Sequence, residues 1–263
     1  MENFRIYGEA PYNVAVIHGG PGAAGEMAPV ARELASNRGV LEPLQAATSI
    51  EGQVEELRKV LEEYGDLPVT LIGFSWGAWL SHIVAARFPT LVKKLILIGS
   101  GGFEEKYGAQ TQHARLARLS DDEMDEYQSL IKVLNDPATE GKEKAFGRLG
   151  DLMSKVDTYS PLKAAYDESD GVIINEGIFH HVWRDADELR RSGGLLELGH
   201  HIECPVVAIH GDYDPHPAEG VREPLSGVLR DFRFILLKNC GHRPWIEKYA
   251  KEEFYEALKR ELV

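Results

Sequence analysis

Short, nearly continuous apolar runs alternate along this chain with stretches in which apolar residues follow helical spacing. The apolar runs that we read as strands cover residues 13–17, 40–44, 69–73, 94–98, 205–209 and 233–237. They are rich in Val, Ile and Leu at successive positions, as is typical of strands that are covered on both faces. Strands that alternate with helices form a parallel sheet with helices on both sides. The pattern therefore predicts an α/β fold with a mostly parallel sheet.

Several of the intervening stretches carry helix signals. Apolar residues have helical spacing in 27–34 and 50–64, and a last helix is expected from about 246 to 262. Thr48 and Glu51 have the spacing of a capping box at the start of the second helix, and Ser120 and Glu123 have the same spacing further along.

The alternation stops between residues 101 and 199. We find no convincing strand in this block, and helices are expected over 120–135, 140–156, 160–167 and 175–192. A crossover between parallel strands usually needs only about a dozen residues, so this block is too long to be one. We interpret 101–199 as a helical cap inserted into a core domain made of residues 1–100 and 200–263.

Charge and cysteine content exclude several classes of protein. The net charge is −13, whereas binding to nucleic acid or to an anionic membrane surface needs a positive field. Cys204 and Cys240 are too few for a disulfide framework and form no CxxC pair, so both are expected to be reduced thiols. The first thirteen residues have no apolar leader segment, and no run reaches the roughly 18 apolar residues of a membrane span. We therefore expect a cytoplasmic protein.

The sequence GFSWG places Ser75 between Gly73 and Gly77, directly after a predicted strand and before a predicted helix. This is the context of a nucleophile elbow, in which a tight turn lifts the serine hydroxyl into a cleft. An ordinary turn is the alternative for this motif taken alone, because serine is common in turns.

A serine needs a base and an oriented acid to become a nucleophile, and in this architecture the order along the chain is Ser, acid, His. His242 follows the last predicted strand, and Asp212 and Asp214 follow the one before it. The carboxyl ends of parallel strands are where open α/β sheets hold their sites. We expect His242 to be the base and Asp214 its acid, with Asp212 as a structural turn residue that remains the alternative acid.

The sequence HGGPG follows the first strong strand. A carbonyl attacked by Ser75 would develop a negative oxygen that needs fixed N–H donors. We expect the backbone N–H groups of Gly20 and of Trp76, one residue past the serine, to form this oxyanion hole. A flexible turn is the alternative reading of HGGPG alone.

Taken together, HGGPG, GFSWG and CGHRPW resemble the α/β-hydrolase superfamily, and most closely its proline iminopeptidase-like branch. The resemblance covers the core on both sides of the cap. It implies Ser75 as nucleophile, His242 as general base, Asp214 as acid and Gly20 and Trp76 as oxyanion positions, with no organic cofactor and no metal. The segment INEGIF is similar to a cap segment of that branch, which makes Glu176 a candidate for binding a substrate amine.

These observations leave three functions open. The first is an aminopeptidase that acts on short peptides, the second is a carboxylesterase or other small-molecule hydrolase, and the third is a non-catalytic ligand binder on the same fold. The two adjacent histidine pairs, 180–181 and 200–201, do not suggest a metal site, because neighbouring side chains on a helix point apart. The sequence predicts a small-molecule or short-peptide substrate. It does not indicate whether the protein is a monomer or an oligomer.

Overall fold

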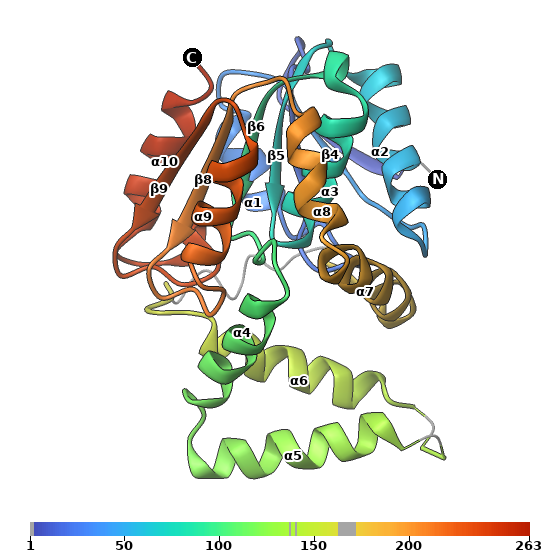
Figure 1. Ribbon diagram of the computed structural model, residues 1–263, viewed down its shortest axis with the longest axis vertical. Helices are drawn as coiled ribbons and strands as arrows, with labels where there is room; N and C mark the ends of the chain where they lie inside the picture. The colour runs from blue at the N-terminus through green and yellow to red at the C-terminus, as the bar shows by residue number, and fades with distance from the viewer. Residues whose placement is uncertain (1–2, 137, 140, 163–171) are drawn as a thin grey trace.

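The computed structural model of the chain describes residues 3–136, 138–139, 141–162 and 172–263. Its centre is a seven-stranded sheet with the strand order β1-β4-β2-β5-β6-β8-β9, in which β1 pairs antiparallel with β4 and the other pairs are parallel (Figure 1). The strands are β1 (Phe4–Tyr7), β2 (Val14–Ile17), β4 (Val40–Pro43), β5 (Val69–Phe74), β6 (Val92–Ile98), β8 (Val206–Gly211) and β9 (Phe232–Leu237). The predicted α/β architecture with a mostly parallel sheet is confirmed.

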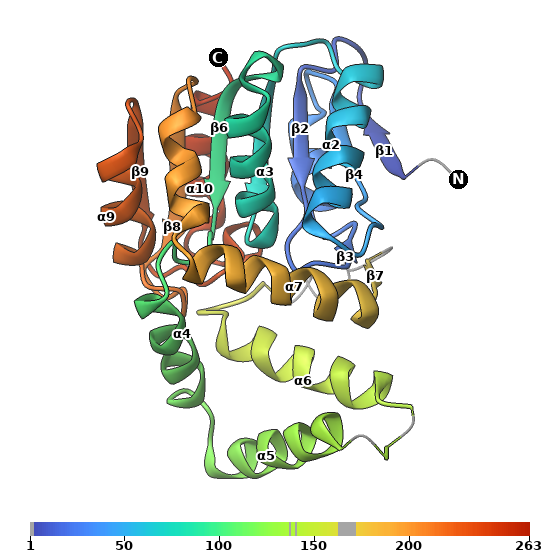
Figure 2. The same cartoon turned by 45° about the vertical axis from the view of Figure 1, so that its right-hand side comes forward.

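Helices cover both faces of the sheet. One face carries α2 (Ile50–Tyr64), α3 (Trp76–Arg87), α8 (Gly194–Glu197) and α9 (Glu219–Val228), and the other carries α1 (Ala28–Leu34) and α10 (Lys251–Arg260) (Figures 1 and 2). Each face has its own cluster of buried apolar side chains, with Leu57 and Leu80 in the first and Val30 and Phe254 in the second. The central strands are buried on both sides, which explains their continuous apolar sequence.

The helix caps agree with the sequence in one of two places. Ser120 accepts a hydrogen bond from the backbone N–H of Glu123, and the Glu123 side chain accepts one from the Ser120 N–H, so the predicted capping box at α5 (Asp121–Asn135) is present. The prediction that Thr48 caps α2 is wrong. Ser49 is the N-cap, and its hydroxyl accepts a hydrogen bond from the Gly52 N–H at 3.1 Å. Thr48 and Ser49 are adjacent and both can cap a helix, so the spacing to Glu51 did not identify which of them is the N-cap.

The inserted segment between β6 and β8 is mostly helical. Its longer helices are α4 (Lys106–Leu116), α5, α6 (Glu143–Val156) and α7 (Glu176–Arg191). Figure 2 shows α7 running across the carboxyl edge of the sheet, while α5 and α6 form a hairpin that projects away from it. The last part of the segment returns to the core, since α8 packs against α9 and the 3₁₀ helix Leu198–His201 packs against α3.

One detail of the inserted segment differs from expectation. The two-residue strand β7 (Ile173–Ile174) pairs antiparallel with β3 (Ala23–Ala24), although we expected no strand in this block. A pair of two-residue strands is too short to leave a periodic pattern in the sequence. Most of the helix expected over 160–167 lies outside the described residues.

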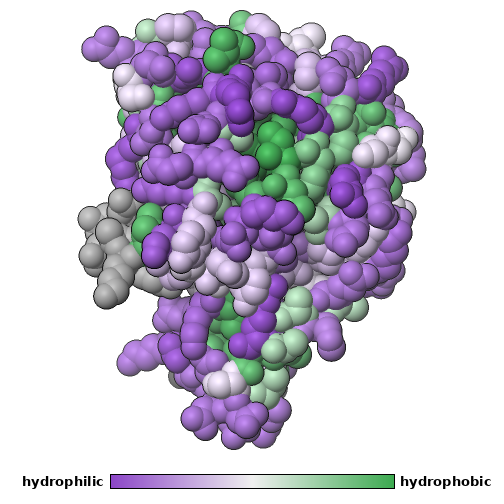
Figure 3. All heavy atoms as spheres, turned by 90° about the vertical axis from the view of Figure 1, so that its left-hand side faces the viewer, coloured by the Kyte–Doolittle hydropathy of each residue, from purple (hydrophilic) through white to green (hydrophobic). Residues whose placement is uncertain are grey.

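The surface beyond the edge strand β9 is mostly hydrophilic, with a hydrophobic area in the upper half of the molecule (Figure 3). Cys204 and Cys240 are both free thiols.

Among the described residues, no helix combines the length and the apolar character that crossing a membrane requires.

Candidate active site

Ser75 occupies the turn between β5 and α3 in a strained backbone conformation, with φ 51° and ψ −114°. A non-glycine residue in this region typically costs about 1–3 kcal/mol and persists where the surrounding structure enforces it. The flanking glycines show what enforces it here. A Cβ on Gly73 would overlap the Gly77 carbonyl, and a Cβ on Gly77 would overlap the carbonyl oxygens at the end of β2. Strand, turn and helix are therefore too close for side chains at either position.

His242 and Asp214 meet beside this turn. Asp214 follows β8 and His242 follows β9, and His242 Nδ1 lies 2.7 Å from Asp214 Oδ2. The Asp214 side chain is completely buried. Asp212 does not take part, because its Oδ1 accepts a hydrogen bond from the Cys240 N–H at 3.3 Å and its other oxygen lies 3.6 Å from Lys238 Nζ. The structure thus brings His242 to Asp214, and Asp212 supports the loop.

Charge and burial shift the pKa values of this pair in opposite directions. Burial alone would lower the pKa of His242, but the negative charge of Asp214 and the hydrogen bond to it outweigh burial and raise that pKa above 6.5. Burial alone would raise the pKa of Asp214, but the neighbouring histidines hold it well below 3.8. The carboxylate is therefore ionised at neutral pH and favours a protonated imidazole.

Two residues near Ser75 are expected to donate backbone N–H groups to an oxyanion. Gly20 lines the same cavity as Ser75 and has a φ of 33°, which a residue with a side chain rarely adopts. Trp76 is the first residue of α3, so its N–H belongs to the turn of the helix that has no internal acceptor. Its side chain points into the core, where Nε1 donates to Gln53 Oε1 at 2.9 Å. Only the Trp76 backbone is available to the site.

Ser75, Gly20 and His242 share a cavity of about 560 Å³ at the carboxyl edge of the sheet. One wall is aromatic. The ring of Trp183 from α7 stacks on that of Trp79 from α3, with centroids 5.8 Å apart, and on that of Phe179, with centroids 6.0 Å apart. The wall therefore combines one core helix and one helix of the inserted segment.

The cavity lining also contains charged residues, and most of these charges are paired. Arg115 and Asp157 form a bidentate ion pair at 2.8 and 2.6 Å. Arg190 pairs with Asp187, and its Nε has no hydrogen-bond partner among the described residues. The remaining charges come from two residues close to the candidate catalytic groups. Glu26 has its pKa raised by burial, and Arg243 donates to the Ser154 hydroxyl.

The comparisons with known proteins agree with the observed fold. Residues 12–249 match the family model described as alpha/beta hydrolase fold. The chain belongs to the α/β-hydrolase family.

Individual relatives of this α/β hydrolase are distant. It is 25% identical over 205 residues to monoacylglycerol lipase abhd6-B of Xenopus laevis and 23% identical over 205 residues to human monoacylglycerol lipase ABHD6. These matches cover 77% of the chain but only 58% of each relative, so the chain spans less than two thirds of their length.

Among solved structures, VinJ has a TM-score of 0.72 at 18% identity and proline iminopeptidase of Mycobacterium smegmatis has 0.71 at 19%. Both matches cover 98% of this chain and 93% of the other. The monoacylglycerol lipase of Paleococcus ferrophilus has a TM-score of 0.66 at 17% identity, covering 98% of this chain and 97% of the other. The expected superfamily is confirmed, and the proline iminopeptidase branch is one of several neighbours.

The α/β hydrolase places Glu176 away from the other candidate residues. Glu176 is the first residue of α7, and its carboxylate lies 3.3 Å from His180 Nε2, one turn along the same helix. It does not line the described cavity that holds Ser75. The carboxyl groups that do line that cavity belong to Glu26, Asp157 and Asp187.

Sequence reasoning missed several residues of this site, and three of them lie beside the candidate catalytic groups. Arg243 directly follows the predicted base, and His216 stands two residues after the predicted acid, so proximity along the chain was a usable signal for both. Glu26 has no such signal, because only the packing of the loop after HGGPG brings its carboxylate beside Gly19. Asp214, His216 and His242 offer three ligand atoms within 4.8 Å of one another, but both ring Nδ1 atoms already lie at hydrogen-bonding distance from the carboxylate.

Proposed function

We propose that this α/β hydrolase is a serine hydrolase that cleaves small-molecule esters through an acyl-enzyme. The observation that carries the proposal is the 2.7 Å contact between a buried, ionised Asp214 and His242, which lines the same cavity as Ser75 on its strained turn. A nucleophile and a base in one cavity, with a buried acid that orients the base, are what acyl transfer requires.

The proposed reaction has two steps. Ser75 Oγ attacks the carbonyl carbon while His242 Nε2 takes its proton, and the N–H groups of Gly20 and Trp76 donate to the negative carbonyl oxygen. The imidazolium then gives its proton to the departing alcohol, which leaves an acyl group on Ser75. A water molecule attacks this acyl group, with His242 again accepting and then returning a proton, and the acid product is released. Throughout, Asp214 holds the His242 Nδ1–H and stabilises the imidazolium.

We also propose that residues 101–199 act as a cap that shapes the substrate pocket. Support comes from the residues that α4, α6 and α7 contribute to the cavity lining, including Arg115, Met153 and Trp183. The aromatic wall offers an apolar surface to the acyl or alcohol part of a substrate.

An ester is favoured over a peptide with a free amine by the pairing of the carboxylates. Asp157 and Asp187, the cap carboxylates that line the cavity, each form an ion pair with an arginine of the same segment. Monoacylglycerol lipases among the relatives and structural neighbours support the same choice. Aminopeptidase activity is the second candidate, and it is favoured by Glu26, whose carboxyl group lines the cavity outside any such pair, and by the similarity to a proline iminopeptidase.

The test compares the wild-type chain with Ser75→Ala. We expect a fluorophosphonate to label the wild type at Ser75 and short-chain aryl esters to be hydrolysed, with kcat lowered about a millionfold in Ser75→Ala. A proline arylamide tests the second candidate on the same preparation. Rapid ester cleavage with an inert amide supports the esterase, and the reverse result supports the aminopeptidase. A folded wild type that is neither labelled nor active on either substrate would leave the non-catalytic binder and overturn the proposal.

A further inference from the structure

The carboxylate of Asp214 is shared between two imidazole rings. Its Oδ2 lies 2.7 Å from Nδ1 of His242, and its Oδ1 lies 2.8 Å from Nδ1 of His216. The backbone N–H of His216 also donates to Oδ1, at 2.9 Å. The proposed mechanism uses only the bond to His242, so the bond to the second imidazole has no role in it.

The side-chain bond from His216 is not required by the turn. An aspartate that accepts the backbone N–H two residues later is a common turn element, and Asp214 makes this bond with any residue at position 216 that has an N–H. The imidazole adds a second donor to the same oxygen. The rings of His216 and His242 are tilted by 36° relative to each other, with centroids 4.7 Å apart, so the two histidines also contact each other beside the carboxylate that they share.

The positions of the protons follow from the acceptors. An ionised carboxylate only accepts, so both Nδ1 atoms must carry a proton. Burial lowers the pKa of His216 to about 4, so this ring is neutral at neutral pH and its single proton is on Nδ1. A third histidine fixes the backbone at this point, because His210 Nε2 donates to the His216 carbonyl at 2.8 Å. His216 is therefore held both by its backbone and by its ring.

We propose that His216 is a positioning residue that acts on His242 through Asp214. This inference rests on the proposed function, in which His242 is the base. The His216 ring fixes the plane of the carboxylate and withdraws part of its negative charge from the oxygen that faces His242. A carboxylate with an additional donor is a weaker acceptor for its other partner. His216 therefore keeps His242 less basic than Asp214 alone would make it, and keeps more of it in the neutral form that can accept a proton from Ser75.

Several titratable and charged groups surround His242. Besides Asp214, they are Asp157 at the end of α6, Arg115 on α4, Glu26 before α1, the adjacent Arg243, and His210 and His216 near the end of β8. The test must therefore change the donor at position 216 and leave these groups in place.

Three substitutions separate the donor from the ring. His216→Phe keeps a ring and removes the donor, and His216→Gln carries its amide beyond the position of Nδ1. His216→Asn places an amide N–H near the position of Nδ1. The matched control is the exposed His200, substituted with Phe and with Asn, because it lies outside the described cavity.

The first measurement is the pKa of His242 by NMR titration in a Ser75→Ala background, which needs no activity. We expect His216→Phe and His216→Gln to raise this pKa by about half to one unit, because Asp214 then interacts more strongly with the imidazolium. His216→Asn should restore most of the wild-type value, and the His200 variants should not change it.

The second measurement is the kinetics of ester hydrolysis with Ser75 intact. The acid limb of kcat/KM should move to higher pH by the same amount, and kcat should fall about tenfold while KM changes less than about twofold, since a misplaced base slows chemistry rather than binding. An unchanged His242 pKa in both donor-removing variants, or an effect confined to KM, would overturn the role of His216. Wild-type enzyme with no Ser75-dependent activity would instead remove the proposed function, so the two failures can be told apart.

Discussion

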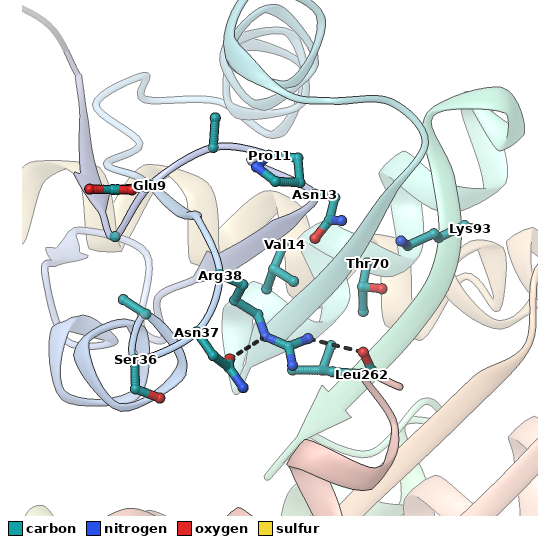
Figure 4. A pocket seen from close by; sticks show the side chains of 13 residues that line it. Glu9, Pro11, Asn13, Val14, Ser36, Asn37, Arg38, Thr70, Lys93 and Leu262 are labelled. Atoms are coloured by element: carbon teal, nitrogen blue, oxygen red, sulfur yellow. Dashed lines mark hydrogen bonds between the residues drawn. The ribbon is translucent and has the colours of Figure 1, made fainter.

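Two cavities of similar volume lie at opposite edges of the same sheet. The cavity at the carboxyl edge, about 560 Å³, holds Ser75 and His242, and the one at the other edge, about 630 Å³, is lined by the starts of β2, β5 and β6 and by residues near the C-terminus (Figure 4). In the second cavity Arg38 donates to the Asn37 side chain and to the Leu262 carbonyl, as Figure 4 shows, so its cation holds a loop to the end of the chain. Volume does not distinguish the two.

What distinguishes them is backbone strain and linked titratable groups. In the first cavity the positive φ of Ser75 falls on a residue that resists it, and His242, Asp214 and His216 form a hydrogen-bonded chain. In the second the positive φ falls on Gly8, which tolerates it. Strain on a non-glycine residue and shifted pKa values at the carboxyl ends of strands are the marks of a functional site, and only the first cavity combines them among the described residues.

The strongest test of this comparison is to remove the negative charge of Asp214, which hydrogen-bonds both His242 and His216. We expect Asp214→Asn to lower kcat by about ten thousandfold, because an amide in place of the carboxylate favours the wrong tautomer of His242. The negative charge of Asp214 raises the pKa of His242, so its loss should move the acid limb of any residual activity to lower pH. Steady-state pH profiles measure both effects.

Asp212→Asn is the matched control for that variant. Asp212 stands two residues earlier in the same loop, and its contacts are to Cys240 N–H and Lys238. We expect kcat to stay within about threefold of wild type, with a loss of about 1 kcal/mol in the free energy of unfolding from the weakened loop bond. Equal damage from both substitutions would mean that the loop as a whole, and not the Asp214 carboxylate, supports His242.

The two sides of the first cavity differ in how much of them the sequence predicted. Ser75, Asp214 and His242 were recognisable because each follows an apolar strand and the fold fixes where strand ends meet. The glycines around Ser75 were recognisable because close packing of backbone leaves no alternative residue. In each case a short stretch of sequence is enough to place the residue in the fold.

The side of the cavity formed by the inserted segment has no such signal. Trp79 and Trp183 stack although they lie 183 − 79 = 104 positions apart in the chain. Helical spacing alone does not say which face of α7 packs against the core. The choice of Glu176 as a cavity carboxylate depended on that face, and the structure pairs it with His180 instead. Side-chain positions that depend on how two segments pack could not be derived from either segment alone.

The aromatic wall gives an intermediate effect that separates binding from chemistry. Trp183→Ala removes the middle ring of the stack, and each aromatic pair contributes about 0.5–1.5 kcal/mol beyond its buried area. For an ester with an apolar acyl group we expect KM to rise about tenfold with kcat within about twofold of wild type, while Trp183→Phe should change KM less. Comparing acyl chains of increasing length measures the contribution of the wall. A fall in kcat at unchanged KM would place Trp183 in the chemical step and contradict its role as a wall.

The smallest expected effect is at the opposite edge of the sheet, and it tests the comparison most directly. Lys93→Ala and Arg38→Ala both remove a cation from the second cavity. We expect kcat/KM for ester hydrolysis to stay within about twofold of wild type in both, because neither cation contacts the hydrogen-bonded chain of the first cavity. Arg38→Ala should also lower the free energy of unfolding by about 1–2 kcal/mol through the loss of its two hydrogen bonds, whereas the exposed Lys93 should change it by less than about 0.5 kcal/mol. Chemical denaturation followed by circular dichroism, beside the kinetic assay, separates these outcomes. A tenfold loss of activity without a loss of stability would show that the second cavity acts on the reaction. Backbone strain and shifted pKa values would then no longer distinguish a functional cavity from a structural one in this protein.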